Sequence, residues 1–198
     1  EGPVRPYRTV ISDSGNDKFV NRLLIGTAST GLVRIEWHQG RTGQMTPTNW
    51  SNVQMLQFMS GFHPLHYQVA DAQNLIVREA IENDFEHLLL WEHDMIPLPD
   101  ASIRLNEYMS SEKVPVVSGF YYTRSMPSEP LVYRGRGTGP WYDYKIGDRV
   151  WADGVPTGFL LIRVSILRAM WDESEEYEMG NTWGRRVFET PRRVWYDP

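Results

Sequence analysis

Residues 85–94 read FEHLLLWEHD, and this stretch decides the fold that we expect. Its consecutive large apolar residues predict a buried β-strand over residues 85–91. The strand ends abruptly in Glu92, His93 and Asp94, and the Pro-Leu-Pro sequence at 97–99 prevents it from continuing. The stretch therefore predicts a buried strand whose carboxyl end carries two acidic side chains.

Strand and helix patterns alternate on both sides of this stretch. Residues 69–81 place apolar side chains at helical spacing, and residues 101–109 follow Asp100, a good helix N-cap. Further strands are expected at residues 22–27, 53–58, 114–122 and 159–163, with short ones at 131–134 and 149–152 and a last helix starting at 164. This alternation predicts an α/β sandwich of three layers with a mainly parallel central sheet.

The composition is that of one soluble globular domain. The chain has 198 residues, of which 41% are hydrophobic and 23% charged. Its apolar runs are far shorter than the ~20 residues that cross a bilayer, so we expect no membrane span. The polar residues 1–21 lack the apolar segment of a secretory signal and are expected to form a flexible N-terminal arm before a single domain at 22–198.

Cysteine, charge and aromatic content narrow the chemistry. The sequence has no cysteine, which excludes disulfides and thiolate metal sites and fits a cytoplasmic location. The net charge of −5 argues against a surface built to neutralise a polyanion. Aromatic residues are frequent in the second half, for example in WYDY at 141–144. Such rings suit sugars and bases as well as ordinary core packing.

Glu92 and Asp94 are the strongest candidates for binding. Because they lie two residues apart at a strand end, we expect them to project to the same side and His93 to the opposite one. Two carboxylates in this arrangement can hold a hard divalent cation such as Mn²⁺ or Mg²⁺. The alternative is a solvated acidic turn. We expect His93 to be a packed or hydrogen-bonded histidine and not a ligand.

Several segments in the same order resemble glycosyltransferases of the GT-A fold, and most closely their family-two-like branch. The DxD region of that family is similar to LLLWEHDMIPLP at 88–99, in which Glu92 replaces the first Asp. The preceding helix resembles VADAQNLIVREAI at 69–81, in which Gln73 replaces a frequent Arg. The following strand resembles VSGFYY at 117–122, and the acceptor-side strand resembles DGVPTGFLLI at 153–162. The resemblance implies a Rossmann-like GT-A domain with its nucleotide-binding part at about 22–122 and its acceptor-side part at about 123–198.

The resemblance also implies a function. It predicts a metal-dependent, inverting transfer of a sugar from a nucleoside-diphosphate sugar, expected to be a UDP-sugar, to an acceptor hydroxyl. Glu92 and Asp94 would hold Mn²⁺ or Mg²⁺. The implied donor-binding residues are Thr27, Ala28, Ser29, Asp71, Asn74, Glu92 and Asp94. Asp71 has an alternative role, in which its carboxylate stabilises the first turn of its helix through the helix dipole.

The acceptor side is predicted less sharply. Asp153 lies where the resemblance places acceptor-facing residues and is our candidate for the general base, although a plain loop carboxylate explains it equally well. Arg124, Arg134 and Arg136 could reach phosphates or be solvated. The acceptor stays open between a glycan, a lipid-linked sugar, a protein and a modified nucleic acid.

Two other functions stay open. A nucleotidyltransferase of similar fold would normally carry a glycine-rich loop with lysine after the first strand, and residues 28–32 contain no lysine. A non-catalytic module that binds a glycan or a nucleotide sugar would keep the fold without turnover.

Overall fold

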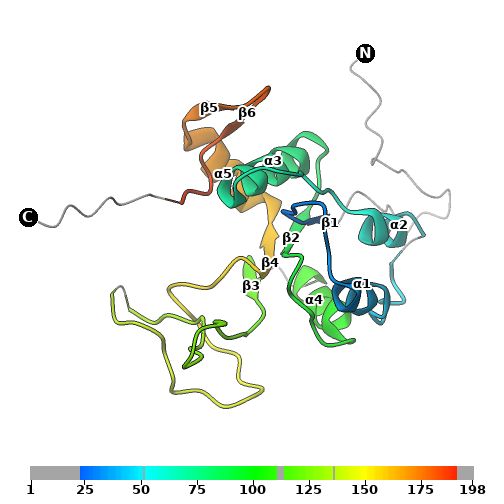
Figure 1. The fold of residues 1–198 in the computed structure, drawn as a ribbon. Helices are drawn as coiled ribbons and strands as arrows, with labels where there is room; N and C mark the ends of the chain where they lie inside the picture. The colour runs from blue at the N-terminus through cyan, green and yellow to red at the C-terminus, as the bar shows by residue number, and fades with distance from the viewer. Residues whose placement is uncertain (1–22, 51, 111–113, 136, 191–198) are drawn as a thin grey trace, which may run out of the picture.

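The computed structural model describes residues 23–50, 52–110, 114–135 and 137–190, and the predicted N-terminal arm at 1–21 lies outside them. Helices surround a central sheet (Figure 1). In chain order the elements are β1 (Leu23–Gly26), α1 (Ile35–Thr42), α2 (Asn52–Ser60), α3 (Val69–Glu82), β2 (His87–Trp91), α4 (Ala101–Ser110), β3 (Val116–Ser118), β4 (Phe159–Arg163), α5 (Val164–Glu173), β5 (Glu176–Met179) and β6 (Thr182–Arg185).

The central sheet has the strand order β1-β2-β4-β3. β1 and β2 pair in parallel, whereas β4 is antiparallel to both β2 and β3. The expected GT-A sandwich with a mainly parallel sheet is therefore wrong, because two of the three pairings are antiparallel. The physical reason is the irregular segment 119–158. It begins where β3 ends and returns to β4 at the same end of the sheet without a helical crossover, so β4 runs in the opposite direction to β3 (Figure 1).

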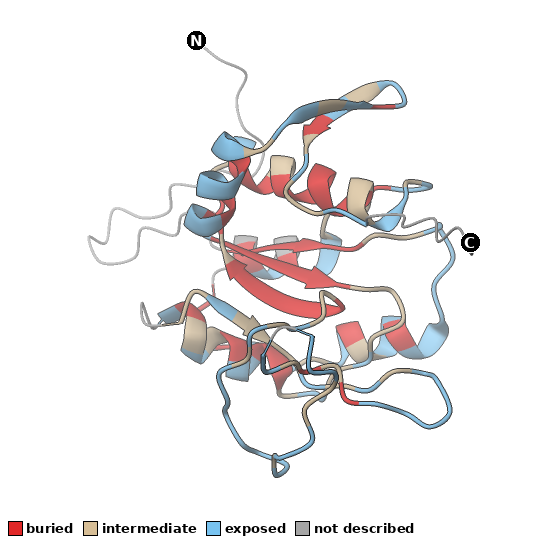
Figure 2. Ribbon diagram, turned by 90° about the vertical axis from the view of Figure 1, so that its left-hand side faces the viewer, coloured by how far each residue is buried: buried red, intermediate tan, exposed pale blue. Residues whose placement is uncertain are grey.

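Helices cover both faces of this sheet, and β1, β2 and β4 are buried between them, whereas the edge strand β3 is partly exposed (Figure 2). Successive strand residues point to opposite faces, as the two-residue period of a strand requires. Helices α3 and α5 pack on the face that carries Leu24, Leu88, Leu90, Leu160 and Ile162. Helices α1, α2 and α4 pack on the face that carries Leu23, Ile25, Leu89, Trp91, Phe159 and Leu161.

The strand predicted at 53–58 is wrong, because these residues belong to α2. Gln54 and Phe58 lie four residues apart and are both buried, which is the spacing of one helix face. The Gln54 amide bonds both backbone groups of Leu23 at 3.1 Å and so covers part of the edge strand β1. A half-buried strand at 53–58 would turn its polar residues to solvent, whereas the polar Gln54 is buried.

The other elements are partly as predicted. The helices expected at 69–81, at 101–109 and from 164 are confirmed as α3, α4 and α5. The short strands expected at 131–134 and 149–152 are absent from the described part of the chain, where Tyr133 makes only isolated bridges to Pro140 and Gly154. Among the described residues, every helix is too short or too polar to span a bilayer.

Candidate functional site

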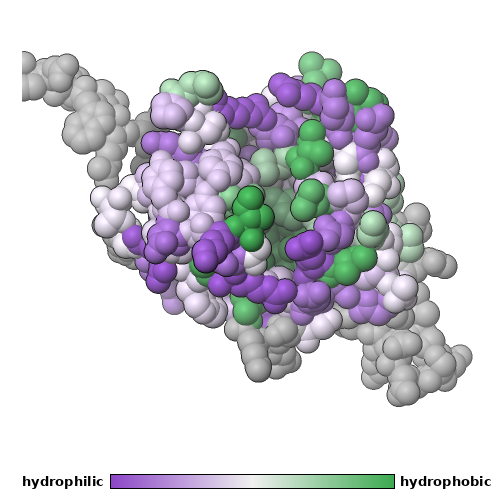
Figure 3. All heavy atoms as spheres, turned by 90° about the horizontal axis from the view of Figure 1, so that it is seen from below, coloured by the Kyte–Doolittle hydropathy of each residue, from purple (hydrophilic) through white to green (hydrophobic). Residues whose placement is uncertain are grey.

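The carboxyl ends of β1 and β2 lie side by side, and the residues that follow them form one edge of the sheet. Gly26 in β1 pairs with Leu90 in β2, just before the acidic residues. The Glu92 backbone N–H donates to the Gly158 carbonyl at 2.9 Å, and the Glu92 carbonyl accepts from the Trp37 indole at 2.9 Å. Figure 3 views the molecule from this side, and the surface is hollowed there, with apolar side chains inside the hollow and hydrophilic ones around it.

The side chain of Glu92 is held by a chain of hydrogen bonds. The Thr157 hydroxyl donates to Glu92 Oε1 at 3.3 Å, and Gln73 Nε2 donates to the same hydroxyl at 2.9 Å. Burial raises the pKa of Glu92 and the negative charge of Asp94 raises it further, while the Thr157 hydrogen bond opposes both effects. Two like charges near one another in a partly buried place favour a nearby cation.

Asp94 already has a cationic neighbour. Arg124 Nη2 lies 2.7 Å from Asp94 Oδ2, and the arginine side chain is mostly exposed. His93 leaves the strand in another direction, with its Nδ1 at 3.2 Å from the Ala28 carbonyl oxygen. This contact links the segment after β1 to the segment after β2, and it makes His93 the hydrogen-bonded histidine that the sequence predicts.

Tyr121 is a site residue that the sequence did not identify. Its phenol oxygen accepts a 2.7 Å hydrogen bond from the Gly158 N–H. A methyl group on Gly158 would lie 2.3 Å from this oxygen and 3.2 Å from Glu92 Oε2, so both groups flank the same glycine. Burial raises the pKa of Tyr121 to about 12, and the charges of Glu92 and Asp94 act in the same direction. Tyr121 therefore stays a neutral phenol beside the two carboxylates.

The candidate site offers few ligands for a metal ion. Among the described residues, no group of three or more His, Asp or Glu side chains is placed to hold one. Glu92 and Asp94 offer two carboxylates, and Mg²⁺ is commonly bound by one or two carboxylates together with water and substrate phosphates. The pair thus fits a hard cation that arrives with a diphosphate.

Thr27, Ala28 and Ser29 follow β1 and are predicted to bind the sugar nucleotide, but they differ in burial. Thr27 is fully buried, and its hydroxyl has no hydrogen-bond partner in the part of the chain that the model describes, so its side chain cannot contact a surface ligand. Ala28 lies beside His93 through its carbonyl. The Ser29 hydroxyl is half-buried and accepts from the Gly31 N–H at 3.0 Å. Of the three, only Ala28 and Ser29 are therefore partly open to solvent.

Asp71 and Asn74 face away from Glu92, although they sit on the same helix as Gln73. Asn74 Nδ2 donates to the Tyr177 hydroxyl at 2.9 Å, and its amide bonds both backbone groups of Phe188 at 2.8 and 3.0 Å. The Tyr177 hydroxyl donates to Asp71 Oδ1 at 2.7 Å. Asn74 is completely buried by these contacts, so the structure does not bring it to the predicted donor site.

Asp153, the candidate base, is exposed and tied to a turn. Its Oδ2 accepts from the Gly135 N–H at 2.6 Å, and its backbone N–H donates to the Tyr133 carbonyl at 2.9 Å. None of the hydrogen bonds found among the described residues joins Asp153 to Glu92 or Asp94. Its role as a base stays a prediction.

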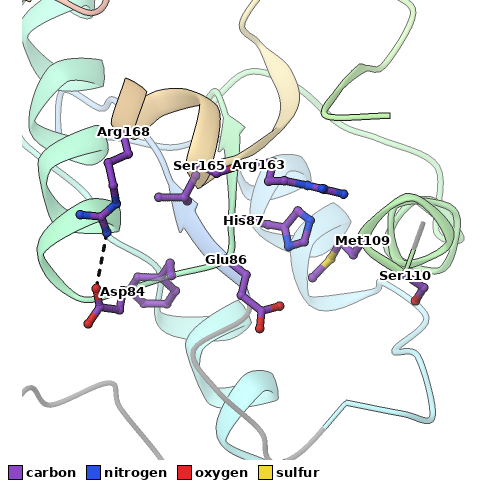
Figure 4. Close-up of a pocket in the computed structure, with 10 residues that line it drawn as sticks. Asp84, Glu86, His87, Met109, Ser110, Arg163, Ser165 and Arg168 are labelled. Carbon is purple, nitrogen blue, oxygen red and sulfur yellow. Dashed lines mark hydrogen bonds and ion pairs between the residues drawn. The ribbon is translucent and has the colours of Figure 1, made fainter. Parts of the chain in front are cut away.

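Two pockets lie elsewhere on the molecule. The larger, of about 570 Å³, lies at the amino-terminal end of β2, opposite the Glu92 edge, and is lined by charged residues of both signs (Figure 4). Arg168 in this pocket lies 3.4 Å from Asp84 and also donates to the Ile81 carbonyl at 3.2 Å. The smaller, of about 320 Å³, lies between the start of α3 and the β5–β6 hairpin and includes Asp71. Neither pocket has Glu92 or Asp94 in its lining.

Comparisons with known proteins bear on the fold alone. No family model matches the chain, and no curated protein matches it. Among solved structures, that of A197 from STIV is similar, with a TM-score of 0.51 and 19% identity over 74% of this chain and 67% of that one. At this identity the likeness supports a shared arrangement of helices and strands and does not extend to activity.

Proposed function

We propose that this protein transfers a sugar from a nucleoside-diphosphate sugar to an acceptor hydroxyl. The observation that carries the proposal is the pair Glu92 and Asp94 at the carboxyl end of β2, beside the end of β1. Crevices at the carboxyl ends of neighbouring parallel strands are where α/β proteins commonly bind nucleotides. The likeness of the flanking segments to glycosyltransferases points to a sugar nucleotide, with UDP as the expected carrier.

Each residue near the pair has a role that follows from its contacts. Glu92 and Asp94 would hold a divalent cation, whose chemistry is to neutralise the charge that grows on a leaving diphosphate. Thr157 fixes the orientation of Glu92 through its hydroxyl. Arg124 is mostly exposed and pairs with Asp94, so a cation bound by Asp94 would compete with its guanidinium, which could then turn to a phosphate oxygen.

The test is nucleotide binding with and without Mn²⁺. We expect the thermal stability of the protein to rise with UDP, GDP or dTDP only when Mn²⁺ is present, because ligands that bind the native state stabilise it. Asp94→Asn should weaken this binding at least about tenfold, since a neutral amide is a poorer ligand for a hard cation. Calorimetric titration measures both affinities.

Asp100→Asn is the matched control. Asp100 forms an ion pair with Arg104 at 2.7 Å, the same separation as Asp94 and Arg124, but it lies at the start of α4. Its variant should bind nucleotide as the wild type does. Absence of Mn²⁺-dependent binding in the wild type, or equal affinity in the Asp94 variant, would overturn the proposal. Release of UDP from a UDP-sugar then separates a transferase from a binding module.

A further inference from the structure

The segment that follows β3 carries an aromatic cluster, formed by Phe120, Tyr122, Trp141 and Tyr144. The ring of Phe120 lies 5.1 Å from that of Tyr122 and 4.6 Å from that of Tyr144, measured between centroids. Trp141 extends the cluster at 6.1 Å from Tyr144. The rings meet edge-on or tilted, which is the preferred geometry for aromatic pairs.

Two of these rings are open to solvent although the four pack on one another. Phe120 is 46% exposed and Tyr122 is 47% exposed, whereas Trp141 and Tyr144 are half-buried. Single exposed apolar residues are normal on a protein surface, but contiguous ones mark interaction sites. The cluster is therefore a candidate binding surface.

The surface combines apolar ring faces with polar edges. The hydroxyl groups of Tyr122 and Tyr144 are hydrogen-bonded to each other. The Arg134 guanidinium lies over the Trp141 ring at 4.9 Å. A pyranose ring has the complementary pattern, because its C–H groups form apolar faces and its hydroxyl groups form a polar rim.

Charge decides between classes of partner. The segment 119–158 holds five basic residues and four acidic ones, and its net charge of +1 is too small for a surface that binds a polyanion or an anionic membrane. A neutral saccharide needs no excess charge. The counted residues are Arg124, Arg134, Arg136, Lys145 and Arg149 against Glu129, Asp143, Asp148 and Asp153.

The backbone connects the cluster to the acidic pair. Tyr121 lies between Phe120 and Tyr122, and its hydroxyl is bonded to Gly158 beside Glu92. Arg124, two residues after Tyr122, pairs with Asp94. A ligand on the exposed rings would thus lie close in the chain to the residues proposed to hold the donor.

We propose that the aromatic cluster binds a neutral oligosaccharide, and that this saccharide is the acceptor of the transfer. The acceptor role rests on the proposed function, whereas saccharide binding itself does not depend on the donor site. The bound sugar would stack a pyranose face on Phe120 and meet the hydroxyls of Tyr122 and Tyr144 at its rim.

The test measures saccharide binding without any nucleotide. We expect saturation-transfer NMR to detect contact between the wild-type protein and at least one of cellotriose, chitotriose and mannotriose. Phe120→Leu should weaken this binding about tenfold, because it keeps apolar volume but removes the flat ring. Phe120→Trp should retain it. Ile146→Ala, an apolar truncation at a 98% exposed position in the same segment, is the control and should leave it unchanged.

The outcomes separate this inference from the proposed function. Failure of all three trisaccharides to bind overturns the inference, even where Mn²⁺-dependent UDP binding is intact. Equal binding by Phe120→Leu and the wild type overturns it too, as does binding of a short oligothymidine in place of the saccharides. Absence of UDP binding with saccharide binding intact overturns the donor site and the acceptor role instead.

Discussion

Thr157 and Glu92 are joined by a hydrogen bond of 3.3 Å, in which the threonine hydroxyl donates to Glu92 Oε1. The same hydroxyl accepts from the buried amide of Gln73 on α3. This arrangement fixes one oxygen of the carboxylate and leaves Oε2 beside Gly158. The orientation of Glu92 therefore depends on a helix that contributes no charged group to the candidate site.

Thr157→Val should weaken Mn²⁺-dependent UDP binding by about three- to tenfold, because a hydrogen bond to a half-buried carboxylate is lost at nearly constant volume. Thr157→Ser keeps the hydroxyl and should bind nearly as the wild type does. Calorimetric titration of both variants measures the difference. Equal affinities for the valine and serine variants would mean that this hydroxyl does not position Glu92.

Asn74→Ala should lower the free energy of unfolding by about 2–4 kcal/mol, since it leaves buried partners at Phe188 unsatisfied and opens a small cavity. Among the described residues, the side-chain hydrogen bonds of Asn74 go to Tyr177 and Phe188, so the affinity for UDP should stay at the wild-type value. Urea denaturation and nucleotide titration check the two expectations. Loss of UDP affinity in a variant that stays folded at the assay temperature would return Asn74 to the donor site.

The fold was predictable where one periodicity dominates. Residues 69–81 have a clear helical face, and Ile76 and Val77 in α3 are fully buried as that face requires. The direction of β4 was not predictable, because an apolar run such as Phe159–Arg163 has the same pattern in a parallel and an antiparallel sheet. Only the path of the segment 119–158 sets that direction, and a segment without periodicity gives no indication of its path.

The candidate site also has residues that the sequence reveals and residues that it does not. Glu92 and Asp94 were identified because two carboxylates interrupt an apolar run, a signal contained in neighbouring residues. Tyr121 and Thr157 were missed because their roles come from contacts with Gly158 and Glu92 across long stretches of chain. Asn74 contacts Tyr177 of the β5–β6 hairpin, and the sequence does not show which flank of α3 meets that hairpin.

His63 should make stability depend on pH. Burial lowers the pKa of His63, and the nearby Arg41 guanidinium lowers it further. The unfolded chain then binds a proton more readily than the folded one, so the stabilising contribution is complete above the ordinary pKa of about 6.5 and is lost as the pH falls through it toward the folded value. Between about pH 7.5 and about pH 5, a range that includes the ordinary histidine pKa, the free energy of unfolding of His63→Gln should accordingly fall less than that of the wild type.

Urea denaturation at several pH values checks this expectation, with His38→Gln as the matched control because His38 is an exposed histidine on α1. The control should follow the wild-type profile. Parallel profiles for wild type and His63→Gln would show that protonation of His63 is not coupled to folding.

Asp153→Asn separates a chemical role from a structural one. The Asp153 carboxylate accepts from the Gly135 N–H at 2.6 Å, and an asparagine at this position keeps an oxygen for that bond while losing basicity. If Asp153 takes the proton from the acceptor hydroxyl, transfer should fall by ~10²–10⁴-fold while UDP affinity stays unchanged.

Asp153→Ala also removes the oxygen that accepts the hydrogen bond from the Gly135 N–H. It should lower the free energy of unfolding by about 0.5–1.5 kcal/mol more than the asparagine variant does. Rates of UDP release from a UDP-sugar, measured beside urea denaturation, resolve the two effects. Transfer that persists in Asp153→Asn and declines only in Asp153→Ala would assign this carboxylate to the Gly135 turn alone, and the proton would then have to leave through another group near Glu92.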